Sequence, residues 1–111
     1  MRAAQAALEK KAKDVLILDV KDLTTITGYF VICSGESTTQ VKAITELIEE
    51  TFDDLRFKPL GIEGLKHGHW VLMDYGDIIV HIFEEETRVF YELEKLWIDA
   101  ARISPEEHHS S

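Results

Sequence analysis

The sequence predicts an α/β domain in which a mixed β-sheet is covered by amphipathic helices. Short apolar runs that suit buried strands alternate with segments whose apolar residues recur every three or four positions. The chain has 111 residues, 45% hydrophobic and 30% charged, which is typical of one globular domain with its own core. No internal repeat or linker divides it. We therefore predict a single domain over residues 1–103 and a polar tail over 104–111.

The N-terminal part is predicted to form one helix and two strands. Residues 2–12 are rich in Ala, Leu, Glu and Lys, which favour helix. The unbroken apolar run 15–18 suits a strand that is covered on both faces, and 29–33 forms a second such strand after a linker over 24–28. The single cysteine, Cys33, lies in this second run, so we expect a buried thiol rather than a nucleophile, and no internal disulfide is available.

A long helix is predicted in the middle of the chain. Ser37 is its expected N-cap, and Gln40 is expected to reach back to the Ser37 backbone in a capping box. Pro59 and Gly61 close the segment. One apolar stripe runs along the helix at intervals of three or four residues: Val41, Ile44, Leu47, Ile48, Phe52 and Leu55.

A hairpin and a final helix complete the prediction. Strands over 70–73 and 78–83 flank the turn 74–77, whose Gly and Asp residues are typical of hairpins. Acidic residues 84–86 would complement the N-terminal dipole of the last helix, and Ser104-Pro105 would end it. Its expected buried stripe consists of Val89, Phe90, Leu93, Leu96 and Trp97.

The charge balance limits the classes of partner. Twelve basic and 21 acidic side chains give a net charge of −9, and no run of Lys and Arg forms a basic patch. Such a chain repels polyanions, which argues against simple nucleic-acid binding. The N-terminus lacks a signal-peptide apolar stretch, and no segment approaches the roughly 18 apolar residues of a membrane helix. We expect a protein of the bacterial cytoplasm.

An enzymatic interpretation stays open as the alternative. The turn Ser34-Gly35 precedes a helix N-terminus and could hold a phosphate, although Glu36 would repel it and a plain capped turn explains the same residues. Asp74 and Asp77 could bind magnesium, but they are three positions apart across a turn, whereas nucleotidyl transfer favours two carboxylates on one strand. Pinning the hairpin is the structural explanation for both aspartates.

The histidines are candidate zinc ligands without a zinc-site spacing. His67 and His69 lie in a Gly-containing loop, and His81 lies in an apolar strand. We expect His81 to be a core histidine or to bond to a side chain of a neighbouring strand. No metal site or cofactor is predicted.

The strand 70–73 presents a candidate interaction surface. Trp and Tyr are enriched at binding hot spots, and only one face of a strand near a sheet edge is needed for the core. Trp70 could equally pack against the helices, and the sequence leaves both possibilities open. Alternation places one set of residues on each face: Trp70, Leu72 and Asp74 on one, Val71, Met73 and Tyr75 on the other.

Several segments together resemble the ribosomal silencing factor family, also called Iojap-like. They are residues 29–35, with Ser37 and Gln40-Val41 following, then Glu63-Gly64, 70–83 and 88–97. The resemblance covers about residues 3–102. It implies a fold related to nucleotidyltransferases but without their catalytic carboxylates.

The resemblance also implies a function. Family members bind the large ribosomal subunit through ribosomal protein L-fourteen, block joining of the small subunit and so lower translation when nutrients are scarce, without a cofactor. Isolated members often form homodimers. A dimeric adaptor with another target is a third hypothesis.

The resemblance also nominates contact residues. We expect the ribosomal contact to include Trp70, Leu72, Asp74, Tyr75 and Asp77. Trp70 would be the apolar anchor and the aspartates would pair with Lys or Arg. Arg88 and Tyr91 are further candidates. With a net charge of −9, docking is expected to be chiefly protein to protein, onto a basic ribosomal protein, with little direct nucleic-acid contact.

Overall fold

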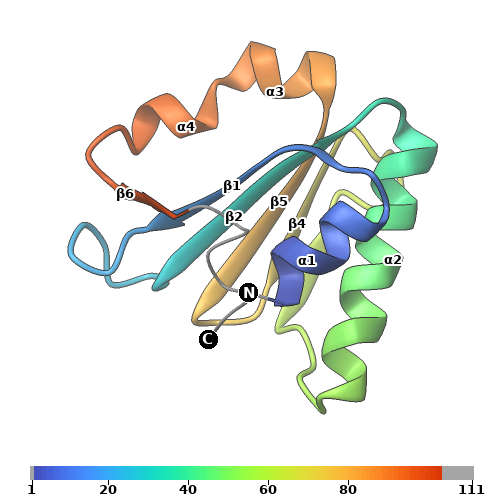
Figure 1. Cartoon of the computed structure of the whole chain (residues 1–111), viewed down its shortest axis with the longest axis horizontal. Helices are drawn as coiled ribbons and strands as arrows, with labels where there is room; N and C mark the ends of the chain where they lie inside the picture. Colours follow the sequence, from blue (N-terminus) through green and yellow to red (C-terminus); the bar gives the residue numbers. More distant parts are fainter. Residues whose placement is uncertain (1, 104–111) are drawn as a thin grey trace.

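A computed structural model describes residues 2–103 of the chain (Figure 1). Six strands form one sheet in the order β3-β4-β5-β2-β1-β6. The strands are β1 Lys13–Asp19, β2 Tyr29–Gly35, β3 Gly61–Glu63, β4 Trp70–Asp74, β5 Ile78–Glu84 and β6 Ala101–Ile103. The helices are α1 Arg2–Glu9, α2 Thr38–Asp54, α3 Glu85–Tyr91 and α4 Leu93–Leu96.

The sheet is mixed, as the sequence predicts. β2 and β5 pair in parallel at its centre, in a register that runs from Tyr29 opposite Ile78 to Gly35 opposite Glu84. All other neighbouring strands are antiparallel. The connection between the parallel strands contains α2, because parallel strands need a long crossover. The predicted α/β class is therefore confirmed.

Helices α1 and α2 cover one face of the sheet (Figure 1). The buried side of α1 consists of alanines, whose small side chains let its backbone approach α2 closely. The predicted stripe of α2 lies against the sheet, with Val41, Ile44 and Ile48 fully buried. Leu55, the last predicted member, is the C-cap and 40% exposed. The longest amphipathic stripe in the sequence thus packs into the larger core.

The start of α2 confirms the predicted cap, with one difference. The Ser37 side chain accepts a hydrogen bond from the Gln40 backbone N–H at 3.1 Å. The Gln40 side-chain oxygen accepts from the backbone N–H of Glu36 rather than of Ser37. Its amide also donates to the carbonyls of Lys10 and Lys11. Gln40 therefore ties the end of α1 to the start of α2.

Helices α3 and α4 lie over the opposite face (Figure 1). The second core cluster there includes Phe30, Ile32 and Phe83 from the central strands. Trp97 packs on it, with its ring centroid 5.0 Å from that of Phe30 in an edge-to-face arrangement. These helices are short, so this face is covered less completely than the face under α1 and α2.

Three of the five residues in the predicted buried stripe of the last helix are exposed. α3 ends after Tyr91 because Glu92 adopts a left-handed conformation with φ of 48°. Leu93 and Trp97 do pack on the core, but Val89, Phe90 and Leu96 are 73–80% exposed. The residue that faces the sheet from α3 is Arg88, so the apolar residues that follow it point outward.

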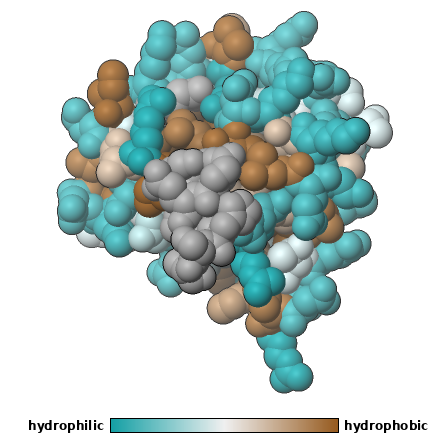
Figure 2. Space-filling model, in the orientation of Figure 1, coloured by the Kyte–Doolittle hydropathy of each residue, from teal (hydrophilic) through white to brown (hydrophobic). Residues whose placement is uncertain are grey.

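Two short edge strands, β3 and β6, are absent from the sequence-based prediction. Each has three residues, and pairing with β4 or β1 defines them rather than any local pattern. The predicted polar tail over 104–111 lies outside the described residues. Within residues 2–103, no helix is long and apolar enough to cross a bilayer. The face of the molecule shown in Figure 2 is largely hydrophilic, with apolar areas between the hydrophilic ones.

Candidate partner-binding surface

An aromatic surface at the junction of β4 and α3 is the candidate functional site. We call it the Trp70 face and define it by Trp70, Leu72, Phe90 and Tyr91. Trp70 and Leu72 point to the same side of β4, and both are half-buried. Tyr91 extends the surface because its ring centroid lies 4.8 Å from that of Trp70, and Phe90 follows at 5.1 Å from Tyr91. Phe90 is 80% exposed, so the surface is open to a partner.

Trp70 is held in one orientation by its neighbours on β5. Its indole N–H donates to Nδ1 of His81 at 3.1 Å, and its ring stacks on Phe83 with centroids 4.8 Å apart. The two strands pair antiparallel, with Trp70 opposite Phe83. A fixed, half-exposed aromatic loses little side-chain entropy when a partner covers it. Trp70 therefore packs on β5 and on Tyr91 of α3, and part of its side chain stays exposed.

His81 beneath Trp70 is a neutral core histidine. Its side chain is 5% exposed, and burial lowers the pKa of His81 from 6.5 to about 4. Because Nδ1 accepts the hydrogen bond from Trp70, the ring proton resides on Nε2. This confirms the expectation of a core histidine that bonds to a side chain on a neighbouring strand.

Gly64, in the loop before β4, determines how closely the chain can approach Trp70, the first residue of that strand. Gly64 has φ of +85°, and a Cβ atom added there would lie 2.0 Å from the carbonyl oxygen of Trp70. Only glycine fits both the left-handed backbone and the close approach. Gly64 therefore allows Trp70 to enter the strand at its observed position.

The other three predicted contact residues divide between the hairpin and the opposite face. Asp74 ends β4, and its carboxylate accepts from the Gly76 N–H at 2.8 Å. Asp77 is exposed, and its carbonyl accepts from the N–H groups of Gly28 and Tyr29. The Asp74 side chain thus stabilises the hairpin turn, as the structural explanation expects, whereas Asp77 contributes through its backbone carbonyl, which any residue could supply. Tyr75 points to the α2 side, as strand alternation predicts, so the five residues do not share one face.

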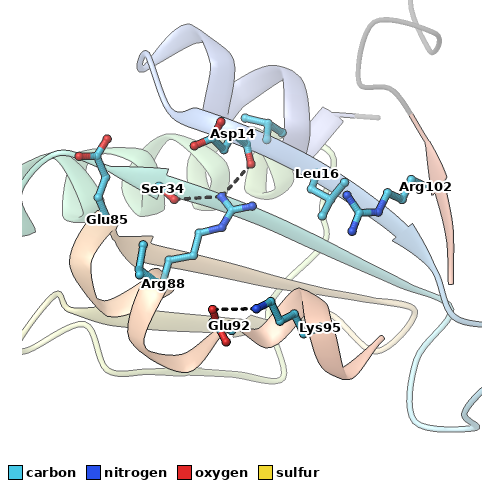
Figure 3. A pocket seen from close by; sticks show the side chains of 10 residues that line it. Asp14, Leu16, Ser34, Glu85, Arg88, Glu92, Lys95 and Arg102 are labelled. Carbon is cyan, nitrogen blue, oxygen red and sulfur yellow. Dashed lines mark hydrogen bonds and ion pairs between the residues drawn. The ribbon is translucent and has the colours of Figure 1, made fainter. Parts of the chain in front are cut away.

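Arg88, a further candidate, has a structural position at the base of α3 (Figure 3). Its guanidinium donates to the Asp14 carbonyl at 2.8 Å and to the Ser34 hydroxyl at 2.9 Å. It lines a cleft of about 700 Å³ in which Lys95 pairs with Glu92. Acidic and basic side chains alternate around this cleft, so it offers no uniformly positive site for an anion.

The turn that could have held a phosphate is occupied by structural contacts. The Ser34 hydroxyl is buried against Arg88, and the Glu36 carboxylate pairs with Lys13. The side chain of Ser37 caps α2. A Cβ atom on Gly35 would lie 3.0 Å from a methyl group of Val41, so the turn packs tightly on the helix. These contacts match a capped turn.

The remaining candidate ligands are scattered. His69 is exposed, and its Nδ1 atom lies 3.0 Å from the Glu84 carboxylate. His81 is buried within β5. Across residues 2–103, no three His, Cys, Asp or Glu side chains come together as a metal site would require. Cys33 is fully buried, and desolvation raises the pKa of its thiol to about 12. The expectation of a buried thiol at this position is confirmed.

Comparison with known proteins decides the family. The family model described as "Ribosomal silencing factor during starvation" matches residues 1–111. The chain belongs to the ribosomal silencing factor family. A relative named ribosomal silencing factor in Bacillus subtilis is 42% identical over 98 residues, which are 88% of this chain and 83% of the relative.

Solved structures of similar proteins confirm that this silencing-factor chain has the family fold. A crystal structure from Chromobacterium violaceum superposes with a TM-score of 0.84 at 34% identity, covering 86% of this chain and 79% of that one. A crystal structure from Bacillus halodurans gives a TM-score of 0.83 at 34% identity and covers 93% of both chains. The family resemblance inferred from the sequence is therefore confirmed.

Sequence reasoning missed the exposure of Phe90 in this silencing factor. One signal was available, because Val89, Phe90 and Tyr91 are consecutive and cannot all face one side of a helix. The sequence could not show that Arg88 would face the sheet, since its acceptors lie 54 and 74 residues away.

Proposed function

We propose that this protein binds the large ribosomal subunit through ribosomal protein L-fourteen and sterically blocks joining of the small subunit. Translation would fall when nutrients are limiting, in the bacterial cytoplasm. The Trp70 face carries this proposal, because it places fixed and exposed aromatic side chains on a rigid sheet in a chain of the silencing-factor family. A steric mechanism requires no turnover, metal or cofactor, so we propose a regulator rather than an enzyme.

Charge supports a protein partner rather than RNA. The chain carries −9, whereas ribosomal RNA is a polyanion. Trp70 and Leu72 would supply the apolar centre, and Asp74 at the end of the same strand would meet Lys or Arg at the rim. Tyr75 points to the opposite face of the sheet and Asp77 lies in the hairpin turn, so the contact proposed here centres on Trp70, Leu72 and Asp74. Binding should weaken with added salt, and free RNA should not compete.

Co-sedimentation with purified large subunits tests the proposal. Phe90→Ala removes an exposed ring of the Trp70 face, and Ile26→Ala removes a comparably exposed apolar side chain from the loop before β2. We expect the first to weaken binding about tenfold, as for an interface hot spot, and the second to bind like wild type. Circular dichroism would verify that both fold. Equal binding by both variants, or no binding by wild type, would contradict the proposal.

We also propose that the free protein forms a homodimer through the same face. Phe90 and Tyr91 of this face are 80% and 51% exposed, and they offer apolar surface that a second copy could cover. Light scattering should then give twice the 12.7 kDa chain mass for wild type and the monomer mass for Phe90→Ala. A monomeric wild type at micromolar concentration would refute the dimer without affecting the ribosomal proposal.

A further inference from the structure

His81 is a polar side chain in an otherwise apolar stretch of a central strand. All the other residues from Ile78 to Phe83 of β5 are apolar. The residues opposite His81 are Ile32 on β2 and Leu72 on β4, and its side chain is 5% exposed. Burying an imidazole costs free energy that an aliphatic side chain would not cost. An aliphatic residue would therefore be favoured at this position unless the imidazole has a role of its own.

The structure gives His81 such a role in its hydrogen bond to Trp70. Trp70 lies opposite Phe83, so His81 is its diagonal neighbour on the adjacent strand. Diagonal neighbours are within reach of a large aromatic side chain, and the indole N–H donates to Nδ1 of His81 at 3.1 Å. On the β2 side, Phe30 contacts the imidazole edge to face, with ring centroids 5.2 Å apart. The acceptor for Trp70 is thus itself held in place within the sheet.

Ring stacking by itself does not fix the orientation of Trp70. The indole stacks on Phe83 with an interplanar angle of 28° and contacts Tyr91 at 48°. These contacts define the plane of the ring, but a flat ring can stack in more than one rotation about its Cβ–Cγ bond, a torsion with broad minima. A hydrogen bond is directional and leaves the indole from one edge only. The bond to His81 therefore selects one of the orientations that stacking allows.

The same hydrogen bond determines which chemistry Trp70 offers to a partner. The indole N–H is the only polar group of this side chain, and in the observed orientation it is used within the protein. The exposed part of the half-buried ring is then hydrocarbon, which suits an apolar pocket on a protein partner that supplies no acceptor. A ring turned the other way would bring its N–H to the interface, where removing it from water without an acceptor is unfavourable.

We propose that His81 is a positioning residue for the ribosomal contact, acting through Trp70 without touching the partner. It fixes the indole before binding, so that less side-chain freedom is lost when the partner covers the ring. This inference rests on the function proposed above for the Trp70 face. Because His81 is buried beneath that face, its contribution differs from those of Phe90 and Tyr91, which are exposed to the partner.

A double-mutant cycle in binding to purified large subunits tests the role of His81. His81→Leu removes the acceptor and keeps a side chain of similar size, whereas Trp70→Phe removes the indole N–H and keeps a ring that can stack on Phe83. With Trp70 in place, His81→Leu should weaken binding about fivefold. In the Trp70→Phe background the same change should leave binding unaltered, because no N–H remains to be positioned. His81→Asn, whose amide oxygen can accept, should bind nearer to wild type.

NMR of the free protein reports the position of the indole without the ribosome. The chain has two tryptophans, and Trp97, which packs on Phe30, provides an internal reference. The Trp70 indole N–H should exchange with water about tenfold more slowly in wild type than in His81→Leu, since the hydrogen bond protects it. The exchange rate of the Trp97 indole should change little between the two proteins. Circular dichroism and urea unfolding would verify that every variant is folded.

The outcomes separate this proposal from the function on which it rests. Failure of wild type to bind large subunits would contradict both. If wild type binds and His81→Leu weakens binding equally in both backgrounds, His81 has a general structural role and only the positioning proposal is wrong. If His81→Leu binds like wild type, or exchange at the Trp70 indole is unchanged, the orientation of this ring does not depend on His81 and the proposal is again wrong.

Discussion

Protonation of His81 should destabilise the fold under mildly acidic conditions. The imidazole is buried between β4 and β2, where Phe30 contacts it edge to face at 5.2 Å. Trp70 donates to its Nδ1 atom, and a protonated ring could not accept that hydrogen bond. Lowering the pH from 7.5 to 5.5 therefore acts on a group that the native state keeps neutral.

The sign and size follow from the two pKa values. The pKa of His81 is about 4 in the folded protein and 6.5 in the unfolded chain, so the unfolded state binds the proton more readily. The stabilisation that the neutral His81 side chain gives the folded state is fully present above pH 6.5 and is lost as the pH falls from 6.5 to 4. At about 1.36 kcal/mol per pKa unit, the total loss is about 3 kcal/mol. The part lost between pH 7.5 and 5.5 is about 1.4 kcal/mol.

Urea unfolding at the two pH values, followed by tryptophan fluorescence, measures this loss. His81→Asn is the matched control, because its amide oxygen can accept from Trp70 but does not titrate in this range. The variant starts less stable, and its pH dependence should be smaller than that of wild type by about 1.4 kcal/mol. Other histidines contribute equally to both proteins. If the two proteins lose the same stability, the assignment of His81 as a neutral buried base is wrong.

Three further predictions concern stability and reactivity. Gly64→Ala should lower the free energy of unfolding by about 3 kcal/mol or more, because residue 64 has a positive φ and the added Cβ would collide with the Trp70 carbonyl oxygen. Gly61→Ala, which has open space around it, is the control, and urea unfolding measures both variants. Cys33 should react with Ellman's reagent about a hundredfold more slowly in the native protein than in guanidinium, since its thiol is buried and has a raised pKa. Equal reaction rates in the two conditions would contradict the burial of this thiol. Arg88→Met should cost about 2–3 kcal/mol in thermal or urea unfolding, whereas Arg102→Met in the same cleft is exposed and should be near neutral.

The long helix and the central strands could be predicted from the sequence because their signals are local. The α2 stripe repeats over several turns, and its N-cap residue lies next to it in the chain. The runs at β2 and β5 are apolar because these central strands are covered on both faces. Alternation along β4 correctly separated Trp70 from Tyr75. Each of these features depends on neighbours within a few residues.

The sequence alone determined the α/β class and the family, but it left open whether Trp70 packs inward or presents surface. Tertiary structure decided which surfaces remain open. Arg88 turns toward acceptors on β1 and β2, and this rotation exposes Phe90. Phe52 near the end of α2 packs edge to face on Tyr75 of the hairpin, a contact between residues more than 20 positions apart in the chain. Local periodicity specifies which side of an element is apolar, but the covering of that side depends on long-range contacts that no short window of sequence contains.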